Sequence, residues 1–189
     1  FVQAWYQGGI SVIDFTDSLN PIEIAYFDRG PIMEDELITG GYWSVYYYEG
    51  TIYGTEITRG LDILKLIPSE YLSENEIAAA ALAYPMIGHR RAFNPQQQVP
   101  MHWPASPAVA RAYIDQLLRD KAIDEDVADQ IIEKLDQVKI EMEMGGNNRL
   151  ARQINRFSLS VEGLNADAQT KNRFERLDAT LKGISEGLR

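Results

Sequence analysis

Over residues 1–67, apolar and polar residues alternate in short runs that are separated by glycine pairs and turn residues. Such runs, rich in Tyr, Trp, Ile, Val and Thr, are typical of short antiparallel β-strands. We predict strands over residues 2–7, 10–15, 22–27, 43–48, 51–58 and 61–67. Gly8-Gly9 should form a tight hairpin because glycine tolerates positive φ, and residues 17–21 should form an Asx-type turn before the third strand.

From residue 106 onwards, apolar residues recur every three or four positions, which predicts about four amphipathic helices. Ser106 is the expected N-cap of the first helix, with Pro107 at its first position, and Gly145-Gly146 should end the second. The expected buried stripes are Val109, Tyr113 and Leu117; Val127, Ile131, Leu135, Val138 and Met142; Leu150, Ile154, Phe157 and Val161; and Phe174, Leu177, Leu181, Ile184 and Leu188. Helices of this kind bury their stripes against one another in an antiparallel bundle, or against a partner.

The segment between these two regions predicts a connector. Ser73 and Glu76 have the spacing of a capping box, so we expect a short helix that ends by Pro85. Residues 88–104 contain prolines and the large apolar residues Phe93, Met101 and Trp103, which predicts an extended strap lying on an apolar surface. The expected fold class is thus β plus α, with a β segment at 1–67, a connector at 68–105 and a helical bundle at 106–189.

The two halves of the β segment are similar in plan. Aligning residues 9–13 (GISVI) with residues 60–64 (GLDIL) gives a spacing of 51 residues, near the ~40 to 50 expected of propeller blades. A fragment of an ordinary β-sandwich is the alternative that this periodicity leaves open. Residues 10–17 (ISVIDFTD), followed by Asn20-Pro21 and a strand, resemble the LVIVD repeat of secreted bacterial β-propellers, and residues 53–66 resemble a degenerate last copy of that repeat.

The resemblance covers residues 1 to about 75 and implies a propeller fold with a periplasmic, secreted or cell-surface location. It implies no reaction, because these repeats are defined by structure and not by a catalytic motif. A propeller needs at least about four blades of four strands each, so six strands make only about one and a half blades. We therefore expect the remaining blades to lie upstream of Phe1, or another protein chain to cover the exposed edges.

Charge and composition narrow the range of partners. The net charge of -10 divides into -7 for residues 1–67, -1 for 68–105 and -2 for 106–189. An acidic chain repels nucleic-acid phosphates and anionic lipids, and the basic run at 89–91 is only three residues long, so we expect no nucleic-acid partner. No run of apolar residues is long enough to predict a membrane span, so membrane association would need a partner.

Candidate chemistry is sparse. The chain has no cysteine and two histidines, His89 and His102, which lie too far apart for a local metal motif and are expected to be satisfied within the strap. The acidic runs at 14–17 and 34–36 could hold calcium, but neither has the twelve-residue loop of a recognisable site, which favours solvated loop carboxylates. No nucleophile or nucleotide motif is present, so we expect no catalytic residue, metal or cofactor.

The most unusual local composition is a cluster of aromatic residues at 43–53. Tyr46 and Tyr48 should face one side of their strand, and Trp43, Val45 and Tyr47 the other. One set is expected in the core, and the other is the candidate partner-binding face, with sheet packing as the alternative. The candidate partner-binding residues are Trp43, Tyr46, Tyr47, Tyr48, Tyr53 and, in the strap, Trp103.

These observations favour a non-catalytic interaction or scaffold protein, in which another protein chain or an upstream part of the same polypeptide covers the sheets. Two alternatives stay open. The chain could be a peripheral accessory subunit that stabilises a larger membrane-bound complex. It could also belong to an enzyme whose active site lies in upstream blades.

Overall fold

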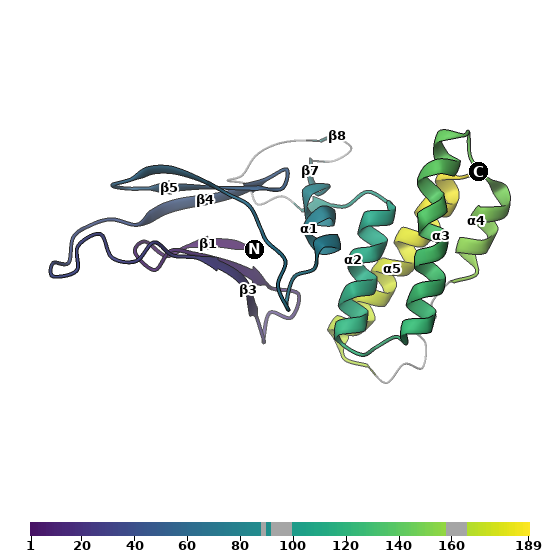
Figure 1. Cartoon of the computed structure of the whole chain (residues 1–189), viewed down its shortest axis with the longest axis horizontal. Helices are drawn as coiled ribbons and strands as arrows, with labels where there is room; N and C mark the ends of the chain where they lie inside the picture. Colours follow the sequence, from purple (N-terminus) through teal and green to yellow (C-terminus); the bar gives the residue numbers. More distant parts are fainter. Residues whose placement is uncertain (88–89, 92–99, 158–165) are drawn as a thin grey trace. The chain divides into compact units, whose positions relative to one another are not determined.

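The computed structural model describes residues 1–87, 90–91, 100–157 and 166–189. These residues form an α+β fold with three small antiparallel sheets and five helices. The chain divides into two compact units, Phe1–His102 and Trp103–Arg189, which we describe separately. The first unit contains the sheets and one helix, and the second contains the other four helices (Figure 1).

The first sheet has the strand order β1-β2-β3, built from Val2–Ala4, Ile10–Asp14 and Ile22–Phe27. The predicted hairpin is present, but β1 ends at Ala4, earlier than predicted. The turn occupies Trp5 to Gly9, where the Trp5 N–H donates to the Gly9 carbonyl at 2.9 Å. Gly9 has positive φ as predicted, whereas its positive-φ companion is Tyr6 (φ 55°) and not Gly8.

The second sheet has the order β4-β5-β6, built from Tyr42–Tyr48, Thr51–Glu56 and Gly60–Leu64. The two sheets lie face to face as separate layers (Figure 1). Tyr6 and Tyr42 exchange backbone hydrogen bonds at 2.9 and 3.2 Å, which joins the turn after β1 to the start of β4. Ile10, only 2% exposed, fills the space over Gly54, and the rings of Phe27 and Tyr42 meet edge-on at 6.3 Å.

The predicted short helix is α1, Glu74–Ala81, and its capping box is confirmed by hydrogen bonds that Ser73 and Glu76 exchange at 3.1 and 2.7 Å. The expected strap is in part a third sheet, in the order β8-β7-β9, from Arg90–Arg91, Tyr84–Ile87 and Met101–His102. His89 and Phe93 lie outside the described residues. The 103–189 unit begins within the predicted connector, at Trp103.

The second unit consists of α2 (Pro107–Arg119), α3 (Glu125–Glu143), α4 (Asn148–Asn155) and α5 (Ala168–Gly187). The Ser106 hydroxyl accepts from the Val109 N–H at 3.4 Å with Pro107 in the first turn, which confirms the predicted start of α2. Gly145 and Gly146 adopt positive φ directly after α3, as expected of a helix stop.

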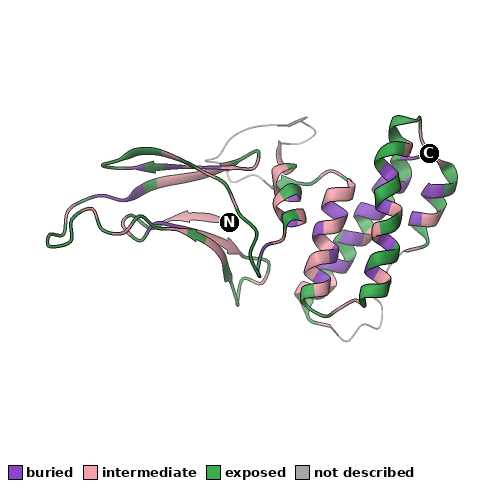
Figure 2. Ribbon diagram, viewed as in Figure 1, coloured by how far each residue is buried: buried purple, intermediate pink, exposed green. Residues whose placement is uncertain are grey.

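The four helices share one hydrophobic core, visible as the buried faces in Figure 2. The α5 stripe is buried throughout, as predicted. Two details of the other stripes differ. Met142, predicted as the end of the α3 stripe, is 46% exposed although it keeps the helical phase of Ile131 and Leu135, because it lies in the last turn of α3, beyond Val138, where the shared core ends. α4 ends at Asn155, earlier than predicted, and Val161 lies outside the described residues.

Candidate interaction surface

One face of the second sheet is uncharged and carries exposed aliphatic and aromatic side chains. Cross-strand pairing places Tyr46, Tyr53 and Ile63 in one row and Ser44, Thr55 and Leu61 in the next. Partners that lie opposite each other in an antiparallel sheet project from the same side. Tyr48 lies on this side as well, opposite Thr51. We call this surface the outer face of the second sheet, and it consists of Ser44, Tyr46, Tyr48, Thr51, Tyr53, Thr55, Leu61 and Ile63.

The outer face leaves large apolar side chains in water. Ile63 is 63% exposed, Leu61 58% and Tyr48 40%, while Tyr46 and Tyr53 are half-buried by their neighbours. The opposite, packed face of the same sheet carries the buried residues Ile52 and Gly54. Single exposed apolar residues are common, but neighbouring ones on a regular sheet make this face the candidate interaction surface.

A β-bulge explains the position of Trp43. The register between β4 and β5 shifts between Tyr42 and Ser44, so the usual alternation of side chains is interrupted there. Tyr42 is buried, and Trp43 is 69% exposed with its ring edge-on to that of Tyr6 at 6.0 Å. The prediction that Trp43 shares a side with Val45 and Tyr47 assumed an unbroken strand, and the bulge removes that assumption.

The six candidate residues thus separate in the structure. Tyr46, Tyr48 and Tyr53 lie together on the outer face. Tyr47 lies on the packed face opposite Ile52, where its hydroxyl is buried and burial raises its pKa above the ordinary value. Trp103 belongs to the other unit and is 46% exposed. Leu61 and Ile63 were not among the candidate residues, although their alternation with Asp62 and Leu64 in the sequence places them on one side of their strand.

The first sheet also has an outer face. Gln3, Ser11 and Tyr26 form one cross-strand row, and Tyr26 is 76% exposed. Trp5 lies beside this row, because its indole N–H donates to the Ser11 hydroxyl at 2.9 Å, and it is 52% exposed. Ser11 in turn donates to Glu23 at 2.5 Å. Apolar side chains of the sheet unit therefore reach solvent on both outer sides of the two-sheet stack.

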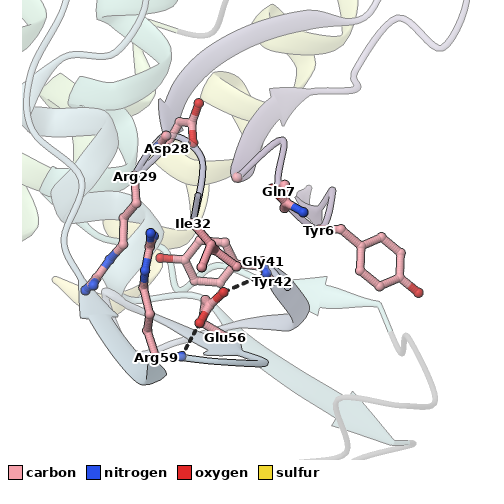
Figure 3. Close-up of a pocket in the computed structure, with 11 residues that line it drawn as sticks. Tyr6, Gln7, Asp28, Arg29, Ile32, Gly41, Tyr42, Glu56 and Arg59 are labelled. Atoms are coloured by element: carbon pink, nitrogen blue, oxygen red, sulfur yellow. Dashed lines mark hydrogen bonds between the residues drawn. The ribbon is translucent and has the colours of Figure 1, made fainter. Parts of the chain in front are cut away.

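A polar cluster fixes the end of the stack where the Tyr6 turn meets β4 (Figure 3). The Glu56 carboxylate, 5% exposed, accepts from the Gly41 N–H at 2.6 Å, from the Thr58 N–H at 2.9 Å and from the Arg59 N–H. Burial alone raises the pKa of the Glu56 carboxyl, but the hydrogen bonds from Gly41, Arg59 and Thr58 outweigh it and hold the pKa below its ordinary value. The ionised Glu56 carboxylate therefore has a structural role, because it accepts hydrogen bonds from the turn that follows it in the chain.

A second polar contact joins the two sheets. Arg29, which follows β3, forms an ion pair with Asp62 of β6, and the Tyr42 hydroxyl donates to the same carboxylate. Burial and the adjacent Asp62 raise the pKa of Tyr42 to about 12. The cavity beside these groups measures about 10 Å³, which is roughly the space of one water molecule.

Asp14, Asp17 and His102, which were considered for metal binding, have local roles. Asp14 accepts from the Thr16 N–H at 2.9 Å and hydroxyl at 2.6 Å, and Asp17 accepts from the Leu19 N–H at 2.9 Å, so both stabilise turns. His102 stacks on Tyr84 at 6.3 Å. Among the described residues, no three His, Asp or Glu side chains converge as a metal site would require. No helix in the described part of the chain combines the length and apolar character needed to cross a bilayer.

The 51-residue repeat reappears in the strand pairing. Adding 51 to both numbers of each pair in the β1–β2 hairpin reproduces a pair of the β5–β6 hairpin: Val2–Val12 becomes Tyr53–Ile63, Gln3–Ser11 becomes Gly54–Asp62, and Ala4–Ile10 becomes Thr55–Leu61. Gly9 and Gly60 both have positive φ at the corresponding turn. The two hairpins are therefore structural equivalents in the same register.

Comparison with known proteins identifies no relative: no family model matches the chain, and no curated protein or solved structure is significantly similar to it.

Proposed function

We propose that this chain is a non-catalytic protein-interaction or scaffold protein of the LVIVD β-propeller type, in which the first and second sheets are neighbouring blades. The observation that carries the proposal is the outer face of the second sheet, where Leu61 and Ile63 stand exposed on a regular, rigid sheet. A surface of this kind binds another protein, because covering it removes apolar area from water.

The strand arrangement supports propeller-like blades. Each sheet is a three-stranded meander in chain order, and the sheets stack face to face with an equivalent hairpin in each. Propeller blades are such meanders, stacked around an axis. We further propose that the four helices form an antiparallel bundle, and that the protein works outside the cytoplasm, as the repeat resemblance implies.

The polar cluster supports a structural role over a catalytic one. Glu56, the buried carboxylate nearest the cavity, accepts three backbone hydrogen bonds, and its pKa is lowered, whereas a general acid or base at neutral pH needs a raised one. Asp62 is occupied by Arg29 and Tyr42. The cavity itself has room for a single water only.

Site-specific photo-crosslinking tests the proposal. A benzophenone side chain would replace Tyr53 on the outer face or, as a control, Ile140, which is 60% exposed on α3. In the protein's native cells, the probe at position 53 should form a covalent adduct with a defined polypeptide or with another part of its own polypeptide. The probe at position 140 should not form that adduct. Absence of any adduct at Tyr53, with the probe activated and the chain folded, would overturn the proposal.

A further inference from the structure

The repeat defines which faces correspond. In the first sheet, Ile10 lies on the packed face and is 2% exposed, while its counterpart in the second sheet, Leu61, lies on the outer face and is 58% exposed. Val12 and Ile63 stand in the same relation. The outer face of the second sheet therefore corresponds to the packed face of the first sheet, which a stacked sheet covers.

The converse holds at the other side of the stack. Gly54 and Asp62 lie on the packed face of the second sheet, and their counterparts are Gln3 and Ser11 on the outer face of the first sheet. Within the chain, Ile10 packs over Gly54. Leu61 corresponds to Ile10, and Gln3 corresponds to Gly54. If the same contact formed once more, Leu61 would therefore pack over Gln3 of another sheet. One chain thus carries the two surfaces that form this type of contact: the outer face of the second sheet and the outer face of the first sheet.

We propose that copies of this chain stack head to tail, so that the outer face of the second sheet packs on the outer face of the first sheet of another copy, with Leu61 over Gln3. This rests on the proposed function, because it names the partner of the same surface. The contact joins two different faces and is heterologous, so its repetition closes into a ring if the rotation allows. With two sheets a copy, roughly two to four copies would supply the four to eight blades of typical propellers.

The composition of the two faces favours this partner. The outer face of the second sheet has no charged side chain, so its partner needs no complementary charge. The outer face of the first sheet offers the exposed Trp5 and Tyr26, and its Glu23 already accepts a hydrogen bond from Ser11. Contact between these faces therefore buries aromatic and aliphatic area without placing acidic groups opposite each other, in spite of the net charge of -10.

Disulfide trapping tests the stacking directly, because the chain has no natural cysteine. Leu61→Cys and Gln3→Cys would be purified separately, mixed in equal amounts and oxidised gently. Head-to-tail stacking predicts that the mixed disulfide exceeds both self-disulfides at least several-fold. Ile140→Cys, equally exposed on α3, mixed with Leu61→Cys gives the background of random collision. Ile63→Cys with Gln3→Cys is a second pair in case Leu61→Cys folds poorly.

The mass of the unmodified chain gives an independent readout. Light scattering after gel filtration should show an oligomer of roughly two to four copies, and Leu61→Asp should reduce it to the 21.4 kDa monomer with unchanged circular dichroism. Preferred Leu61→Cys self-disulfides would indicate a symmetric dimer and overturn the head-to-tail arrangement. A monomer with disulfides at the Ile140 background would overturn it as well. If crosslinking at Tyr53 then still captures a different polypeptide, the proposed function stands and this inference fails; if it captures nothing, both fail.

Discussion

The two units bury their apolar residues very differently. Of the 22 buried hydrophobic residues that the structure describes, 17 lie in the helical unit and 5 in the sheet unit. Of the 22 large hydrophobic residues that are exposed, 18 lie in the sheet unit and 4 in the helical unit. The helical unit thus completes its own core, whereas the sheet unit leaves apolar area that only another surface can cover. Under the proposed function, the sheets are the part of the chain that associates with a partner.

The polar contacts show the same division. In the helical unit, polar groups join helices: Arg173 of α5, 6% exposed, forms an ion pair with Asp120 at the end of α2, and the Ser185 hydroxyl donates to the Ala151 carbonyl at 3.0 Å. In the sheet unit, the polar cluster of Glu56, Arg29 and Asp62 is gathered at one end of the stack. The outer face of the second sheet has no charged side chain, and its polar groups are the hydroxyls of Ser, Thr and Tyr.

The largest effect is expected in the helical core. Leu177 on α5 is fully buried, so Leu177→Ala should destabilise the helical unit by about 2–5 kcal/mol, through lost apolar burial and the cavity left behind. Urea unfolding followed by the helical circular dichroism signal measures it. The matched change Ile140→Ala, at a 60% exposed position of α3, should cost less than about 0.5 kcal/mol. Similar losses at both positions would contradict a self-contained core.

A smaller effect is expected where the sheets meet. A methyl group on Gly54 would lie 2.8 Å from the Ile10 Cδ1 and 2.9 Å from the Tyr42 ring. Gly54→Ala should therefore destabilise the sheet unit by about 1–3 kcal/mol, as overpacking does. Adding Ile10→Val removes the clashing methyl and should restore part of the loss, measured by near-ultraviolet circular dichroism during unfolding. If the double variant is no more stable than Gly54→Ala, the two sheets do not stack through this contact.

A third effect is confined to acid. The folded-state pKa of Glu56 lies below its ordinary value near 4.5, so its ionised form stabilises the folded sheet unit above that pH. This contribution is lost as the pH falls from about 4.5 through the folded-state pKa. Glu56→Gln should lower the thermal midpoint at pH 7 and flatten its decline below pH 4.5, compared with the unmodified chain. A parallel decline in both proteins would show that Glu56 is not the group responsible.

The smallest effect on folding is expected on the outer face of the second sheet. Ile63→Thr keeps a β-branched side chain in a strand and removes apolar area that already faces water. At concentrations low enough to separate copies, it should change the stability of the sheet unit by less than about 0.5 kcal/mol. Val12→Thr, the equivalent change on the packed face of the first sheet, is the matched comparison and should cost clearly more. Equal costs would mean that Ile63 is already covered within the chain.

Periodicity was sufficient for most of the helices. The α5 stripe and the caps of α1 and α2 follow from local spacing, because each contact involves residues only three or four positions apart. Periodicity did not predict the exposure of Met142, which keeps the phase of the stripe but lies beyond Val138, the last α3 residue in the core. It also gave no sign of the third sheet, which pairs Tyr84 with His102 across 18 positions. Pairing at that separation depends on tertiary context that a local pattern does not contain.

The sheet unit was predictable in outline and not in detail. The 51-residue spacing correctly aligned Gly9 with Gly60, because the hairpin turns impose positive φ at both. The bulge at Trp43 was missed, since nothing in the alternation distinguishes an inserted residue from a regular one. The alternation did separate Tyr46 and Tyr48 from Tyr47, and so identified part of the candidate surface. Which side lies outward could not be predicted, because both sides are apolar.

The packing of Ile10 over Gly54 has an evolutionary consequence. Because the Ile10 Cδ1 lies where a side chain at position 54 would begin, neither position can enlarge by itself without displacing the other sheet. In a lineage that keeps this stack, a larger residue at 54 should follow or accompany a smaller one at 10. Positions 10 and 54, which are 44 residues apart in the chain, should therefore vary together among related sequences that keep the stacked sheets.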